Sequence, residues 1–343
     1  MNFYDIPEHI DTREYGREID NYVRRIARYE ELVAIYTIGS VSLPGISDID
    51  MICILKEPIS NGMKFSALEH SENPRLFLHD VYVVAQEHFE KLQYIIYPSN
   101  LKLVYRRPDL MISPPDTQTI SNNLRLMYLL DINLMRLRQV FIAKSEGQCN
   151  VRNWMTRILS LRHSIDLCKS VGIGLSEETE ETNDRLQEFR QMWLAFRRYH
   201  FNDFSGLFLK AEKAVQDIFQ RALIRFRDMY APETLDGTLL KIGRDKILFT
   251  NGMLPEYSYR GRTRTLICKV PLYLKYHYLG YLGRCEHSYG QEQVNRFRVV
   301  SSHGAFLAKN RLHYSMKGNI GFTYMRQLLL DRLKRLLRVG IDR

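Results

Sequence analysis

Two aspartates, Asp48 and Asp50, lie two residues apart at the start of an apolar run. Side chains at positions i and i+2 of a strand point to the same face, so these two carboxylates are expected to lie side by side. Adjacent carboxylates repel each other unless a cation lies between them. Asp is also depleted in strands, so its presence twice needs a reason. The pair therefore predicts a platform for a divalent metal ion.

A second polar feature, Gly39-Ser40, ends another apolar run, and seven residues rich in Ser, Gly and Pro separate it from Asp48. Glycine lets the backbone approach a bound group closely. Backbone N–H groups and a serine hydroxyl can donate hydrogen bonds to phosphate oxygens. The sequence therefore predicts a phosphate-binding turn beside the metal platform.

The residues around these polar positions predict the elements that hold them. Residues 12–33 carry apolar side chains near helical spacing and begin at Thr12, which can cap a helix. Residues 33–39 and 49–55 are apolar and predict two buried strands, the first ending at the Gly-Ser turn and the second beginning at the aspartates.

A third strand is predicted at residues 75–84, and it contains Asp80 between apolar neighbours. A lone charge in an apolar strand is costly to bury without a partner, so Asp80 is the predicted third carboxylate of the site. A salt bridge, for example to Arg75, is the structural alternative. His79 is expected on the opposite face of the strand, as a packed or surface residue. Three glutamates compete with Asp80 but lie in loop or helix patterns: Glu69, Glu72 and Glu87.

One pattern in the chain consists of Gly-Ser, a seven-residue gap, Asp-Ile-Asp and a third carboxylate on a later strand. This pattern resembles the DNA polymerase beta-like nucleotidyltransferase superfamily, in particular its minimal and aminoglycoside-type members. The resemblance covers about residues 15–90. It implies transfer of a nucleoside monophosphate from a nucleoside triphosphate such as ATP to an acceptor hydroxyl, with Mg²⁺ neutralising the triphosphate. The residues it implies are Asp48, Asp50 and Asp80 as metal ligands and catalytic groups, with Asp80 as general base, and Gly39 and Ser40 as nucleotide-binding groups.

The predicted fold class is α+β, with three domains along the chain. Residues 1–118 form a small mixed-sheet nucleotidyltransferase domain that ends in a Pro-rich linker at 101–116. The pattern turns helical from about residue 119, with Gly172 and Gly174 as stop signals, and it predicts a helical bundle over residues 119–234. Residues 235–343 form a small basic α/β module, in which glycines punctuate short β-like runs before a basic amphipathic helix.

Charge is distributed unevenly along the chain. The first 120 residues hold 12 Lys and Arg against 18 Asp and Glu, whereas residues 235–343 hold 20 against 7. A net charge of +13 in this last part favours RNA or another phosphorylated acceptor as the partner. Tyrosines and arginines alternate over 257–284, as in nucleic-acid-binding surfaces whose aromatic rings stack on bases and whose basic groups track the phosphate backbone. The alternative is that the tyrosines pack a small β module and the arginines are solvated. Four residues have spacings that match no common zinc site: Cys268, His277, Cys285 and His287.

The remaining features concern location and competing functions. Acidic residues interrupt the N-terminal segment, which is not expected of a signal peptide. No apolar run approaches the roughly 18 residues of a membrane helix. Five scattered cysteines indicate a reducing compartment. We therefore expect a cytoplasmic protein with no membrane partner. Two other functions remain open: a catalytically inactive nucleotidyltransferase-like protein that binds nucleic acid or acts as an antitoxin-type partner, and an enzyme that only hydrolyses nucleotides.

Overall fold

The structure is a computed structural model of the 343-residue chain. It describes residues 2–60, 64–110, 112, 115, 120–196, 201–230, 238–242, 245–249, 256–258, 291–310 and 312. The chain divides into two compact units, which we call the sheet unit (Ile10–Ser42, Ser47–Thr119, Arg298–Arg343) and the helical unit (Met1–His9, Leu43–Ile46, Ile120–Phe297). The three predicted domain ranges remain a prediction.

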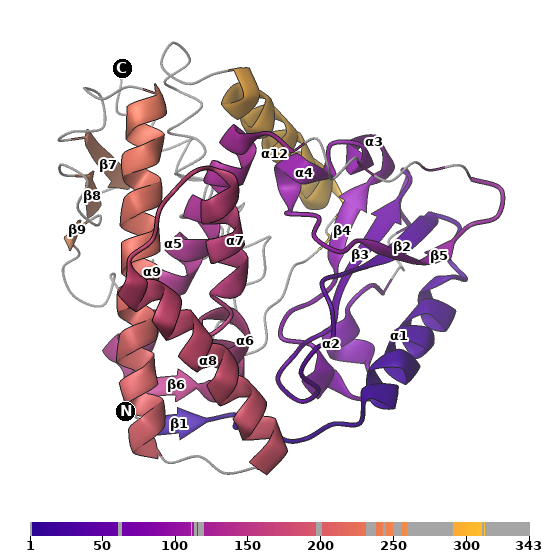
Figure 1. The fold of residues 1–343 in the computed structure, drawn as a ribbon. Helices are drawn as coiled ribbons and strands as arrows, with labels where there is room; N and C mark the ends of the chain where they lie inside the picture. Colours follow the sequence, from indigo (N-terminus) through magenta and orange to yellow (C-terminus); the bar gives the residue numbers. More distant parts are fainter. Residues whose placement is uncertain are drawn as a thin grey trace. The chain divides into compact units, whose positions relative to one another are not determined.

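The sheet unit is built on a four-stranded mixed sheet with the strand order β4-β3-β2-β5. Its strands are β2 (Leu32–Ile38), β3 (Asp50–Leu55), β4 (Tyr82–Ala85) and β5 (Lys102–Arg106). Strand β2 pairs antiparallel with both β3 and β5, and β3 pairs parallel with β4 (Figure 1). The predicted α+β class with a small mixed sheet is therefore confirmed.

Helix α1 (Thr12–Ile26) covers one face of this sheet. Asp11 caps it by accepting a hydrogen bond from the backbone N–H of Arg13. The helix ends earlier than its predicted boundary because the apolar residues from Leu32 onward belong to β2. The shorter helices of the unit are α2 (Ala67–His70), the 3₁₀ helix η1 (Pro74–Leu76), α3 (Gln86–Phe89) and α4 (Leu92–Ile95).

The interpretation of residues 101–116 as a linker is wrong for their first part, because Lys102–Arg106 form the edge strand β5. Leu103 is 44% exposed, whereas Tyr105 packs against the core. A short strand with one open face has a weak apolar signal, and Pro108 nearby made the segment resemble a connection.

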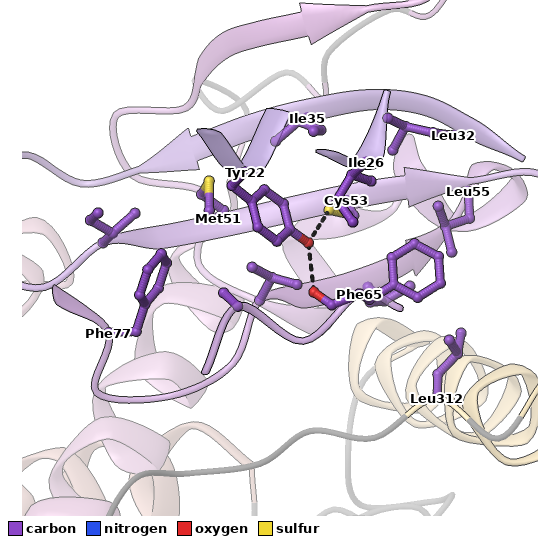
Figure 2. Packing of buried hydrophobic residues seen from close by; sticks show 14 of the residues in the cluster. Tyr22, Ile26, Leu32, Ile35, Met51, Cys53, Leu55, Phe65, Phe77 and Leu312 are labelled. Atoms are coloured by element: carbon purple, nitrogen blue, oxygen red, sulfur yellow. Dashed lines mark hydrogen bonds between the residues drawn. The ribbon is translucent and has the colours of Figure 1, made fainter. Parts of the chain in front are cut away.

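Apolar residues fill both faces of the sheet. On the α1 side, the core includes Tyr22 of α1, Cys53 of β3 and Phe65. The Tyr22 hydroxyl donates to the Phe65 carbonyl oxygen at 2.8 Å and lies 3.3 Å from Cys53 Sγ (Figure 2). Burial is the main cause that raises the pKa of the Tyr22 hydroxyl well above its usual value and the pKa of the Cys53 thiol to about 12. On the opposite face, a second core includes Phe89 and Leu92.

The helical unit confirms the helical pattern predicted after residue 119. Its helices are α5 (Asn122–Glu146), α6 (Val151–Arg157), α7 (Arg162–Ser170), α8 (Glu177–Phe196) and α9 (Phe201–Tyr230). Trp154 of α6 stacks on Phe208 of α9 with 5.0 Å between ring centroids. The buried Arg136 donates to the carbonyl oxygens of Arg157 and Ser160 at 2.7 and 2.6 Å, so it ties α5 to the end of α6.

Strands β1 (Asn2–Tyr4) and β6 (Gln148–Asn150) form a parallel pair in the helical unit. A separate antiparallel sheet contains β7 (Thr238–Ile242), β8 (Asp245–Phe249) and β9 (Glu256–Ser258). Helix α12 (Gln291–Lys309) belongs to the helical unit up to Phe297 and to the sheet unit beyond it.

Several predictions fall beyond the described residues. They concern most of the tyrosine–arginine segment at 257–284, the basic helix near the C-terminus and the cysteines and histidines considered for zinc. In the part of the chain that the structure describes, none of the helices combines the length and apolar character that crossing a membrane requires.

Candidate metal site

The two aspartates lie at the start of β3, in a segment whose side chains alternate between core and surface. Ser47 and Ile49 are buried, whereas Asp48 and Asp50 are only partly buried. The Tyr15 hydroxyl donates to the Ser47 carbonyl oxygen at 2.8 Å, and this bond holds the segment against α1. Asp48 precedes the strand and Asp50 is its first residue, and their carboxylates nevertheless come together, as the two-residue spacing predicts.

A histidine completes the group. Oxygen atoms of Asp48 and Asp50 and a ring nitrogen of His79 all lie within 4.8 Å of one another. His79 Nε2 is 2.6 Å from Asp50 Oδ1. The His79 side chain is 5% exposed and that of Asp50 is 34% exposed, so the group is closed on the imidazole side and open on the carboxylate side. Two carboxylates and one imidazole are a donor set that can hold a divalent cation.

Asp80, the predicted third carboxylate, has a different environment. It is 3% exposed, and its Oδ1 accepts hydrogen bonds from the backbone N–H groups of Ala67 at 2.7 Å and Val81 at 3.0 Å. Ala67 is the first residue of α2, where backbone donors have no partner within the helix. The structure thus brings Asp48 and Asp50 together with His79, while one oxygen of Asp80 binds backbone amides on the α1 side of the sheet.

The expectation that His79 lies away from the aspartates is wrong. It assumed a regular strand from residue 75 to 84, in which neighbouring side chains alternate faces. The chain instead forms η1 at Pro74–Leu76, and β4 begins only at Tyr82. Residues 79–81 precede the strand, so strand alternation does not fix their directions. The sequence signal that could have identified His79 is its position next to Asp80, because histidine is the commonest metal ligand among side chains.

The competing glutamates lie apart from this group. Glu69 and Glu87 are both 73% exposed and lie near the neighbouring histidines His70 and His88. The backbone N–H of Glu72 donates to Glu18, and the Glu72 side chain is exposed. Among the described residues, none of the three belongs to the Asp48–Asp50–His79 group.

The Gly39-Ser40 turn follows β2 directly. Gly39 adopts φ +72°, a left-handed conformation that side chains rarely adopt, and its N–H donates to the Ser99 carbonyl oxygen at 3.0 Å. Gly39 and Ser40 are both exposed. Strand β2 pairs with β3 as far as Ile38 opposite Asp50, so the turn begins one residue beyond the position paired with Asp50.

Comparison of the chain with protein-family models, with curated proteins and with solved structures finds no match.

Proposed function

We propose that the protein is a divalent-metal-dependent nucleotidyltransferase that moves a nucleoside monophosphate from a nucleoside triphosphate to an acceptor hydroxyl. The observation that carries this proposal is the pair Asp48 and Asp50 on one side of the start of β3, next to the exposed Gly39-Ser40 turn at the end of β2. Transfer at an α-phosphate needs carboxylates for a metal ion beside a surface that can bind the other phosphates.

In this proposal Asp48 and Asp50 would hold a divalent cation such as Mg²⁺, which binds proteins through one or two carboxylates and keeps its other positions for phosphate and water. When bound, the ion would neutralise triphosphate charge and favour deprotonation of the attacking hydroxyl. The exposed Ser40 hydroxyl and the backbone at Gly39 would contact the β- or γ-phosphate. The acceptor is proposed to be RNA or another phosphorylated molecule, because residues 235–343 carry a net charge of +13.

A non-catalytic role is the second candidate, and the environment of Asp80 favours it. One oxygen of this carboxylate already accepts two backbone hydrogen bonds, so the described metal group contains two carboxylates and an imidazole instead of three carboxylates. A nucleotidyltransferase-like protein that only binds nucleic acid or a protein partner needs no third carboxylate.

One experiment separates these functions. The full chain is incubated with each of four α-³²P-labelled ribonucleoside triphosphates, Mg²⁺ or Mn²⁺, and cellular RNA, protein or small-molecule fractions. Label that moves into one fraction supports nucleotidyl transfer and identifies the acceptor class. Release of labelled nucleoside monophosphate or diphosphate without transfer supports hydrolysis. Unchanged triphosphate in every reaction contradicts both enzymatic functions and supports the binding role.

A further inference from the structure

The imidazole of His79 is held in one orientation by a contact on its far side. His79 Nδ1 lies 2.7 Å from the backbone carbonyl oxygen of Asp80. A carbonyl oxygen can only accept, so Nδ1 carries the hydrogen of this bond. The other ring nitrogen, Nε2, then faces Asp50. A backbone carbonyl on one nitrogen and a metal on the other is the usual arrangement around metal-binding histidines, because the first contact fixes the tautomer and the ring direction.

The surroundings of the ring restrict it further. The ring of Tyr82 meets the His79 ring edge-on with 4.9 Å between centroids, and the His79 side chain is almost fully buried. Rotation of the His79 ring would break its contacts with Tyr82 and with the Asp80 carbonyl oxygen, so Nε2 stays directed toward the aspartates. The arrangement therefore places one nitrogen donor and two carboxylates around a common point.

We infer that His79 Nε2 is the third protein ligand of the metal site and that the site consequently prefers a first-row transition-metal dication such as Mn²⁺ over Mg²⁺. Imidazole is a ligand of transition metals, whereas Mg²⁺ selects oxygen donors. Mn²⁺ shares with Mg²⁺ the preference for the carboxylate and phosphate oxygens that nucleotidyl transfer would require, but as a transition metal it can also take an imidazole nitrogen. The inference rests on the metal site of the proposed function but does not depend on the transfer reaction.

The test measures binding of the metal alone to the full chain. Electron paramagnetic resonance counts bound Mn²⁺ in the absence of nucleotide, and titration with Mg²⁺ gives the preference. Electron spin echo measurements on the bound Mn²⁺ report coupling to a directly bound ¹⁴N nucleus. We expect one such nitrogen in the wild type and a preference for Mn²⁺ over Mg²⁺ on the order of tenfold or more, because only the transition metal gains from the imidazole ligand.

The His79→Ala variant should lose the ¹⁴N coupling and at least about tenfold in Mn²⁺ affinity, since the loss of even a group that only supports a metal ligand costs about 10–100-fold. His88→Ala is the matched control, because His88 is also a buried histidine of the sheet unit but lies outside the metal group. If His79→Ala does not fold, His79→Asn replaces it, since this variant keeps a polar side chain that cannot supply the imidazole signal.

Wild-type Mn²⁺ without nitrogen coupling, nitrogen coupling that persists in the His79 variant, or equal affinity for Mg²⁺ would each overturn the inference. These outcomes are independent of catalysis. Transfer with Mg²⁺ but no nitrogen coupling would refute the role of His79 and leave the proposed function intact. Mn²⁺ bound through nitrogen without any nucleotidyl transfer would support the role of His79 and contradict the proposed function.

Discussion

Replacing Asp80 distinguishes a structural carboxylate from a metal ligand. In the structure, Asp80 Oδ1 accepts hydrogen bonds from the backbone N–H groups of Ala67 and Val81, at 2.7 and 3.0 Å, and the side chain is 3% exposed. Asp80→Ala would leave both amides without this acceptor in a buried environment. A hydrogen bond to a charged group contributes about 1.5–3 kcal/mol, so the loss of two is expected to lower the free energy of unfolding by on the order of 3–6 kcal/mol.

Asp80→Asn is the informative partner of that variant, because the amide keeps a carbonyl oxygen that can accept the same two bonds. We expect it to lose about 1–2 kcal/mol, since a neutral acceptor forms weaker hydrogen bonds than a charged one. Urea unfolding followed by circular dichroism gives the change in stability. Hydrogen exchange of peptides that contain Ala67 and Val81 shows whether these two amides lose protection.

Two outcomes would refute this view of Asp80. Wild-type stability and unchanged amide protection in Asp80→Ala would show that the two hydrogen bonds do not hold α2. An Asp80→Asn protein that is as stable as the wild type but has lost all nucleotidyl transfer would show that the carboxylate is needed for chemistry, as the resemblance to nucleotidyltransferases implies.

Three further predictions test local features of the fold. Gly45→Ala should destabilise the protein by more than about 1 kcal/mol, because Gly45 has φ +93° and a Cβ there would lie 1.9 Å from the Glu8 carbonyl oxygen. Gly16→Ala in α1 is the control: its Cβ would meet no atom within 4 Å, so it should stabilise the protein by about 0.5–1 kcal/mol. Thermal unfolding compares the two variants. Burial is the main cause that lowers the pKa of His163 to about 4, so the contribution of His163 to stability should be constant above pH 6.5 and be lost as the pH drops from 6.5 toward 4. Urea unfolding at several pH values should show a smaller fall in this range for His163→Gln than for the wild type. The Cys53 thiol, whose pKa is about 12, should resist iodoacetamide at pH 8 in the folded protein and react after unfolding, as peptide mass spectrometry would show; rapid alkylation without unfolding would contradict its burial.

The sequence predicts the strands and the aspartate pair because both follow from local patterns. The apolar runs that became β2 and β3 are bounded by Gly39 and by the aspartates, and the two-residue spacing of Asp48 and Asp50 correctly predicts that their carboxylates lie together. The edge strand β5 gives a weaker signal, because only one of its faces is covered.

The third member of the site could not be predicted in this way. Strand β4 pairs with β3 from Tyr82 opposite Ile52. A regular ladder extended back by two residues would place Asp80 beside Asp50, and this is the arrangement that strand alternation predicts. The ladder begins later, and Asp80 instead accepts the amide of Ala67, which lies in another segment of the chain. Only tertiary contacts of this kind decide which of His79 and Asp80 lies with the aspartates.

Nucleotidyl transfer by the wild type and three purified variants, measured under identical conditions, tests the proposed function. Asp48→Asn and Asp50→Asn remove one negative charge each from the metal group, and Asp20→Asn removes one from the exposed face of α1 as a control. We predict that wild type and Asp20→Asn transfer label from an α-³²P nucleoside triphosphate in the presence of Mg²⁺ or Mn²⁺, and that both metal-group variants lose at least about 100-fold in rate while remaining folded. Transfer at the wild-type rate by either metal-group variant, or no transfer by the wild type with any nucleotide and acceptor fraction, would contradict the proposed function.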